Sequence, residues 1–80
     1  MSVEKLTAIF QDVLEDSNLA LTKTLSAKDV GSWDSFNHIN LVISIETEFA
    51  IRFTTEEIGN LQNVDDLVEL LIRKGVSINW

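Results

Sequence analysis

The sequence predicts an all-α protein: a small four-helix bundle of three longer helices and one short helix, with a long loop between helices 1 and 2. Apolar residues recur at helical spacing in three segments of the 80-residue chain, and an alternating strand pattern is sustained nowhere. The chain has no proline, internal repeat or low-complexity tract. A chain of this length makes one domain, here residues 1–80, with a thin core.

The first predicted helix runs from Val3 to Asp16 and has one apolar stripe, with Ser2 placed to cap its start. The segment 17–34 follows, and loops of this length are uncommon in compact domains and are often functional. Besides small polar residues it contains the branched apolar residues Leu19, Leu21, Leu25 and Val30. These apolar residues indicate that the loop packs across the core.

The second predicted helix extends from Ser35 to Ala50 and carries two apolar lines instead of one. The core face contains Leu41, Val42, Ile45 and Phe49, and the second line contains Phe36, Ile39 and Ile43, close to Asn40 and Thr47. Two interpretations are open: the second line is buried under the long loop, or it stays partly exposed as a docking patch for partner proteins. His38 falls within the core face, where we expect a packing role and a backbone partner in the long loop.

The two remaining helices are marked by their caps. The short third helix begins near Thr55, where Thr54 and Glu57 match a capping box. The fourth runs from Val64 to Lys74, between a capping asparagine and a terminating glycine.

Composition excludes several classes of function. Thirteen acidic and six basic residues give a net charge of −7, which repels nucleic acid. The charge either favours a basic patch on a protein partner or serves only to maintain solubility. The absence of cysteine excludes disulfides, thiolate metal sites and a cysteine nucleophile. No nucleophile–base pair, phosphate-binding glycine loop, EF-hand spacing or metal-ligand cluster is present, so we predict no catalytic residue and no metal site.

Without a leader or a membrane-length apolar run, we expect a cytoplasmic monomer that does not insert into membranes.

The stretch Trp33-Asp34-Ser35-Phe36 places a serine hydroxyl where the loop ends and the second helix begins. A helix start presents unpaired N–H groups and the positive end of the peptide dipole, so an anion attached there is favoured. Asp34 is placed to cap the helix through an N–H group one turn on. This junction is the candidate functional site.

Residues 30–36 (VGSWDSF) resemble the prosthetic-group site of acyl carrier proteins, and residues 41–51, 53–58 and 63–67 are similar to that family's later helices. The resemblance implies that a phosphopantetheinyl transferase, using coenzyme A and Mg²⁺, attaches 4′-phosphopantetheine to Ser35. The thiol of this arm would hold an acyl group as a thioester. The chain would then be a non-catalytic carrier that presents this cargo to acyl-loading and acyl-transferring enzymes.

The same resemblance assigns roles to neighbouring residues. Asp34 would cap the helix and help to hold Mg²⁺ during the modification. The partner-binding residues would be Phe36, Asn40, Ile43 and Thr47.

The second helix departs from the pattern of fatty-acid-synthesis carriers, because Asn37, His38, Asn40 and Ser44 replace much of its usual acidic charge. We therefore expect a specialised carrier, serving polyketide-like, aminoacyl or cell-surface-glycan modification pathways. Two alternatives stay open. The cargo could be aminoacyl instead of acyl, or the chain could be an unmodified helical adaptor that binds a partner helix through Phe36 and Ile43.

Overall fold

The computed structural model describes residues 3–78 and places four α-helices along them. These are α1 (Val3–Val13), α2 (Ser35–Phe49), α3 (Thr55–Gly59) and α4 (Val64–Arg73). Within this range there is no strand, only an isolated bridge between Ser26 and Asn63, so the predicted fold class is confirmed. The capping role predicted for Ser2 lies outside the described residues. No helix between residues 3 and 78 is long and apolar enough to cross a membrane.

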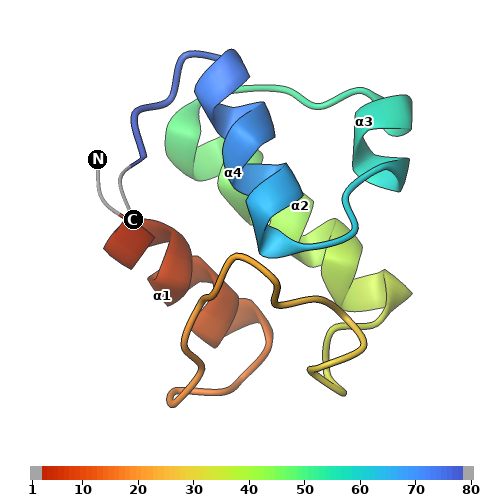
Figure 1. Cartoon of the computed structure of the whole chain (residues 1–80). Helices are drawn as coiled ribbons and strands as arrows, with labels where there is room; N and C mark the ends of the chain where they lie inside the picture. The colour runs from red at the N-terminus through yellow and green to blue at the C-terminus, as the bar shows by residue number, and fades with distance from the viewer. Residues whose placement is uncertain (1–2, 79–80) are drawn as a thin grey trace.

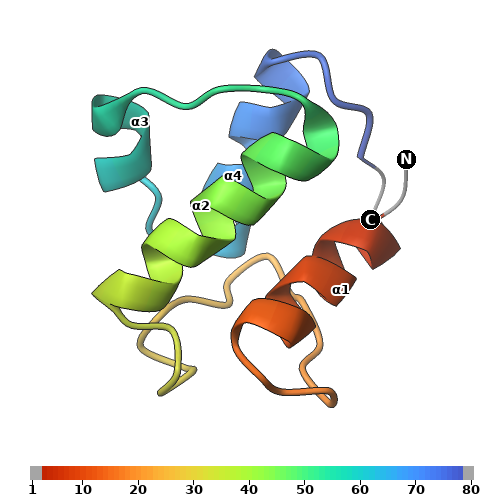
Figure 2. The same cartoon turned by 180° about the vertical axis from the view of Figure 1, so that it is seen from behind.

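The core lies among α1, α2 and α4, while α3 sits on the side of α2 away from α1 (Figures 1 and 2). The most completely buried large side chains are Leu6, Phe10, Ile45, Val64, Val68 and Leu71. The predicted core face of α2 is confirmed for Leu41, Val42 and Ile45, and Phe49 is half-buried at its end. Burial of each such side chain stabilises the fold by roughly 1.5–3 kcal/mol.

The first helix ends at Val13, three residues before the predicted end at Asp16. Glu15 adopts a left-handed conformation with φ of 53°. Its N–H donates to the Asp12 carbonyl at 3.4 Å, and the Asp16 N–H donates to the Gln11 carbonyl at 3.0 Å. This is a Schellman termination formed without glycine, so the sequence gives no signal of it.

The other two long helices each end one residue before the prediction. α2 ends at Phe49, and Ala50 follows as a left-handed cap with φ of 55°, its N–H donating to the Glu46 carbonyl. α4 ends at Arg73, and the predicted glycine stop is present as Gly75 with φ of 94°. The asparagine cap predicted for α4 is also confirmed, since the Asn63 side chain accepts from a first-turn N–H.

The long loop packs across the core, as predicted: Leu19, Leu21, Leu25 and Val30 lie half-buried against it. The loop also holds the start of α4. The Leu25 carbonyl accepts a hydrogen bond from the Val64 N–H at 2.9 Å. The Lys23 carbonyl accepts one from the Asp65 N–H at 3.0 Å. The first two N–H groups of α4, which a helix cannot pair internally, are therefore bonded to the loop.

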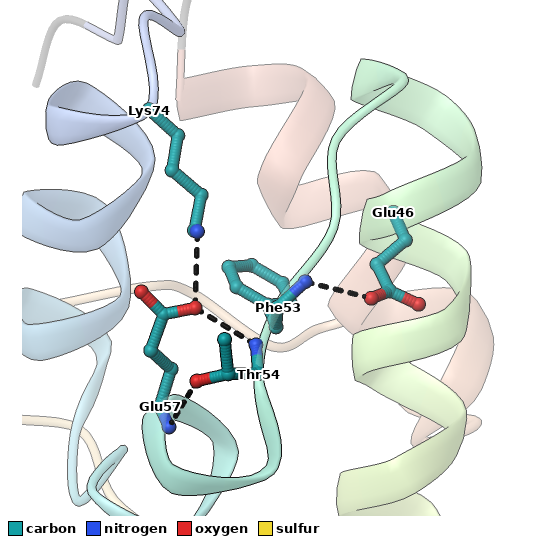
Figure 3. A network of polar contacts seen from close by, with 5 residues as sticks. All are labelled: Glu46, Phe53, Thr54, Glu57 and Lys74. Atoms are coloured by element: carbon teal, nitrogen blue, oxygen red, sulfur yellow. Dashed lines mark hydrogen bonds and ion pairs between the residues drawn. The ribbon is translucent and has the colours of Figure 1, made fainter.

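A polar network connects α3 to both α2 and α4 (Figure 3). Glu46 of α2 accepts a hydrogen bond from the Phe53 N–H at 2.9 Å, just before α3 begins. The predicted capping box is present, because the Glu57 N–H donates to Thr54 Oγ1 and the Thr54 N–H donates to the Glu57 carboxylate. Lys74 then pairs with Glu57 from the end of α4. Since no residue of α3 is fully buried, these bonds contribute to fixing its position.

Candidate functional site at the start of α2

Ser35 is the first residue of α2, and its side chain is exposed. Asp34 before it is extended and caps the helix, with Oδ1 accepting the Asn37 N–H at 2.8 Å. The Asn37 side chain donates in turn to the Ser32 carbonyl at 2.7 Å. These bonds confirm the predicted capping role of Asp34. They close the loop-to-helix junction without using the Ser35 hydroxyl.

The first turn of α2 keeps backbone donors open to solvent. The Asp34 cap takes one N–H group, and within residues 3–78 those of Ser35 and Phe36 have no partner. At the start of α4, by contrast, the loop occupies the first two donors. Open donors at the positive end of the helix dipole attract an anion, which typically gains about 0.3–1 kcal/mol at an exposed site.

Below the junction, the Trp33 side chain is buried and contacts α1 and α2. Its Nε1–H donates to His38 Nδ1 of α2 at 3.1 Å, and its ring meets Phe10 of α1 edge to face with centroids 5.3 Å apart. The His38 ring stacks near that of Trp33, and its Nε2 lies 3.2 Å from the Ile58 carbonyl of α3.

His38 thus has the predicted packing role, but its predicted backbone partner in the long loop is wrong. The loop contributes the Trp33 indole, and the backbone partner is the Ile58 carbonyl, 20 residues further along the chain. The hydropathy pattern of one helix cannot identify a partner that depends on how another helix is placed.

The second apolar line of α2 lies on the surface. Phe36, Ile39 and Ile43 are 74%, 48% and 54% exposed, so the interpretation that buries this line under the loop is wrong. Thr47 is exposed and Asn40 half-buried on the same side of the helix. We call these five residues the α2 patch. Contiguous exposed apolar side chains are typical of an interaction surface.

The α2 patch carries no charge, although the chain as a whole has a net charge of −7. The first turn of α2 contains no acidic residue. The two carboxylates of the helix are used within the molecule: Glu46 accepts the Phe53 N–H, and Glu48 pairs with Lys5 of α1 at 2.9 Å. The patch therefore presents only apolar and uncharged polar groups.

A shallow depression opens beside Ser35, between the loop, α2 and α3. Its lining includes Trp33, Asp34, Ser35, His38, Ile58 and Gly59. Within residues 3–78, no three His, Cys, Asp or Glu side chains gather in a way that could hold a metal ion. The site is thus an exposed hydroxyl at a helix start, next to an open hollow and an apolar patch.

No family model matches the chain. Solved structures with the same fold do show its family. The structure of a holo acyl carrier protein from Geobacter metallireducens is 40% identical, with a TM-score of 0.84, over 90% of this chain and 83% of that one. An acyl carrier protein from Thermotoga maritima is 30% identical, with a TM-score of 0.78, over 90% and 84%. The chain belongs to the acyl carrier protein family, which confirms the resemblance in its sequence.

A curated relative, an acyl carrier protein homolog from Mycoplasma genitalium, is 45% identical over 47 residues. This match covers 54% of the present chain and 56% of the relative. The chain therefore matches little more than half the length of that protein.

Proposed function

We propose that this chain is a carrier in which Ser35 bears 4′-phosphopantetheine. The observation that supports this most directly is the exposed Ser35 hydroxyl at a helix start whose first two N–H groups are open. The residues fit a phosphodiester, because the donors and the dipole favour an anion there. When bound, the arm supplies a thiol that holds an acyl group as a thioester.

In the attachment step, the Ser35 oxygen forms a bond to the phosphorus that adjoins the pantetheine arm of coenzyme A. The bond from this phosphorus to the remaining nucleotide phosphate breaks, and the hydroxyl proton passes to a base of the transferase. The chain contributes a nucleophile held outside the capping bonds of Asp34 and Asn37. No backbone rearrangement of the junction is needed to expose it.

Asp34 would also support the transferase's Mg²⁺. One of its oxygens is engaged in the cap, and a carboxylate oxygen is a ligand that Mg²⁺ prefers. The other ligands would come from coenzyme A phosphates, water and the transferase.

The α2 patch would contact the transferase and later the acyl-loading and acyl-transferring enzymes. Its exposed apolar side chains begin at Phe36, directly after the attachment residue. Because the patch lacks free carboxylates, we propose a carrier that works outside core fatty acid synthesis. Efficient use of the acylated protein by housekeeping fatty acid enzymes would contradict this part of the proposal.

The same patch supports a second candidate function, an unmodified adaptor that binds a partner helix. Incubation with coenzyme A, Mg²⁺ and a broad-specificity phosphopantetheinyl transferase, followed by intact-mass measurement, separates the two. The wild-type chain should gain the mass of one phosphopantetheine, and Ser35→Ala should gain none. Ser32→Ala is the matched control, since it removes an exposed hydroxyl from the loop and should be modified like the wild type. A wild-type chain that gains no mass would favour the adaptor.

A further inference from the structure

We infer that His38 is a positioning residue for the modification of Ser35, an inference that rests on the proposed carrier function. By bonding to Trp33 on one side and to Ile58 on the other, it fixes the loop-to-helix junction against α3. The Ser35 hydroxyl is then presented to the transferase in one orientation.

The partners of the His38 ring define its protonation. Trp33 Nε1 can only donate, and it lies 3.1 Å from His38 Nδ1, so Nδ1 accepts. The Ile58 carbonyl can only accept, and it lies 3.2 Å from His38 Nε2, so Nε2 carries the proton. The tautomer protonated on Nε2 is the form in which both nitrogens are bonded, and the opposite tautomer satisfies neither partner.

These two bonds connect the residue that precedes Asp34-Ser35 to the rest of the molecule. Trp33 is 6% exposed and packs on Phe10 of α1, so its indole is the buried anchor of the loop's end. Ile58 belongs to α3, which forms the opposite wall of the depression beside Ser35. His38 is therefore the link between the two walls that flank the attachment residue.

The other hydrogen bonds at the junction connect only residues that are close in the sequence. The Asp34 cap and the bond from Asn37 to the Ser32 carbonyl connect residues no more than five apart. They set the local path of the backbone but do not reach α3. Without the His38 bonds, the start of α2 and the α3 wall could shift relative to each other. A displacement of about 1 Å between reacting groups can reduce a rate by about a hundredfold.

Steady-state kinetics of the transferase, with this chain as the varied substrate, test the inference. In His38→Phe, which keeps a ring but removes both bonds, kcat should fall about tenfold or more while KM changes less than about threefold. A purely structural role predicts the reverse, because partial unfolding lowers the concentration of folded substrate and raises the apparent KM alone. Val68→Ala is the matched control, since Val68 is a buried core residue of α4 that does not line the depression beside Ser35.

A kcat for His38→Phe equal to that of Val68→Ala would overturn the inference. If His38→Phe does not fold, Trp33→Phe tests the same bond: it removes the indole donor together with part of a buried ring, and its kcat should fall similarly while a loss of folding alone would raise only the apparent KM. Imidazole nitrogen shifts of the wild-type protein give an independent readout: they should show His38 protonated on Nε2, and protonation on Nδ1 would overturn the assignment. A wild-type chain that is never modified would instead refute the carrier function, a result visible by mass before any kinetics.

Discussion

The ammonium group of Lys74 lies 3.0 Å from Glu57 Oε1 and so joins the end of α4 to the first turn of α3 (Figure 3). The same carboxylate accepts the Thr54 N–H at 2.8 Å. The pKa of Glu57 is lowered from its ordinary value of 4.5, first by the backbone hydrogen bond from Thr54 and then by Lys74. The position of the short helix α3 therefore depends in part on one ionised side chain.

Replacing this carboxylate should alter the stability of the protein in acid. A lowered pKa means that the folded state binds fewer protons, so the contribution of Glu57 is present above pH 4.5 and is lost as the pH falls through the lowered pKa. Glu57→Gln should reduce the free energy of unfolding near neutral pH and flatten its decrease in acid. Urea denaturation over a pH series measures both effects, with the exposed neighbour variant Glu56→Gln as the control. Equal acid dependence in Glu57→Gln and the wild type would contradict this expectation.

Ala50→Gly should stabilise the protein. Ala50 ends α2 with φ of 55°, a conformation that costs an L-residue roughly 1–2 kcal/mol and costs glycine little. After subtraction of the greater unfolded-state entropy of glycine, we expect a gain of about 0.5–1 kcal/mol in unfolding free energy. Ala8→Gly, at an exposed position within α1, should instead lower the unfolding free energy by about 0.5–1 kcal/mol. A loss in both variants would show that the left-handed cap carries no strain.

Two substitutions at Asp34 should separate its capping role from its proposed Mg²⁺ role. Asp34→Ala removes the acceptor of the Asn37 N–H and should lower the unfolding free energy by about 1 kcal/mol. Asp34→Asn keeps a good cap and should stay close to the wild-type stability. Both variants should be modified more slowly than the wild type at limiting Mg²⁺, as measured by intact mass over time. If Asp34→Asn is modified as fast as the wild type, Asp34 acts only as a helix cap and the proposed Mg²⁺ role is contradicted.

The α2 patch should bind its partner through apolar contact, with little dependence on salt. Binding of the transferase to Ser35→Ala protein, without coenzyme A, should change less than about threefold between roughly 50 and 500 mM NaCl. Adding Ile43→Ser should weaken binding at least about tenfold, since full burial of an isoleucine contributes roughly 1.5–3 kcal/mol and each 1.4 kcal/mol is a factor of ten. Ile72→Ser is the matched control, because Ile72 is 51% exposed on α4, outside the patch. A steep salt dependence that Ile43→Ser leaves unchanged would argue for a charged contact elsewhere.

The sequence predicts the features that depend on short stretches of chain. Periodicity and caps give four helices, and the Thr54–Glu57 capping box and the Asp34 cap appear where the pattern places them. The exposed serine at the start of α2 also follows from its neighbours, because a capping residue directly before it defines the helix start. Such features require no knowledge of how the helices pack.

Other features depend on the arrangement of distant elements and could not be predicted. The end of α1 is set by Glu15 in a left-handed conformation that glycine more commonly adopts. Whether the second apolar line of α2, which begins at Phe36, is buried or exposed depends on the path of the loop. The loop does not cover this line and bonds to the start of α4. The bond from His38 to Ile58 requires α3 to be in place.

The carbonyl groups of Lys23 and Leu25 make the connection between α1 and α2 a structural support for a helix that starts about forty residues later. Shortening this connection would release the first turn of α4 as well as alter the approach to α2. Tolerance to insertion should therefore differ within the one segment: low around residues 23–25, and greater at exposed positions such as Ser17.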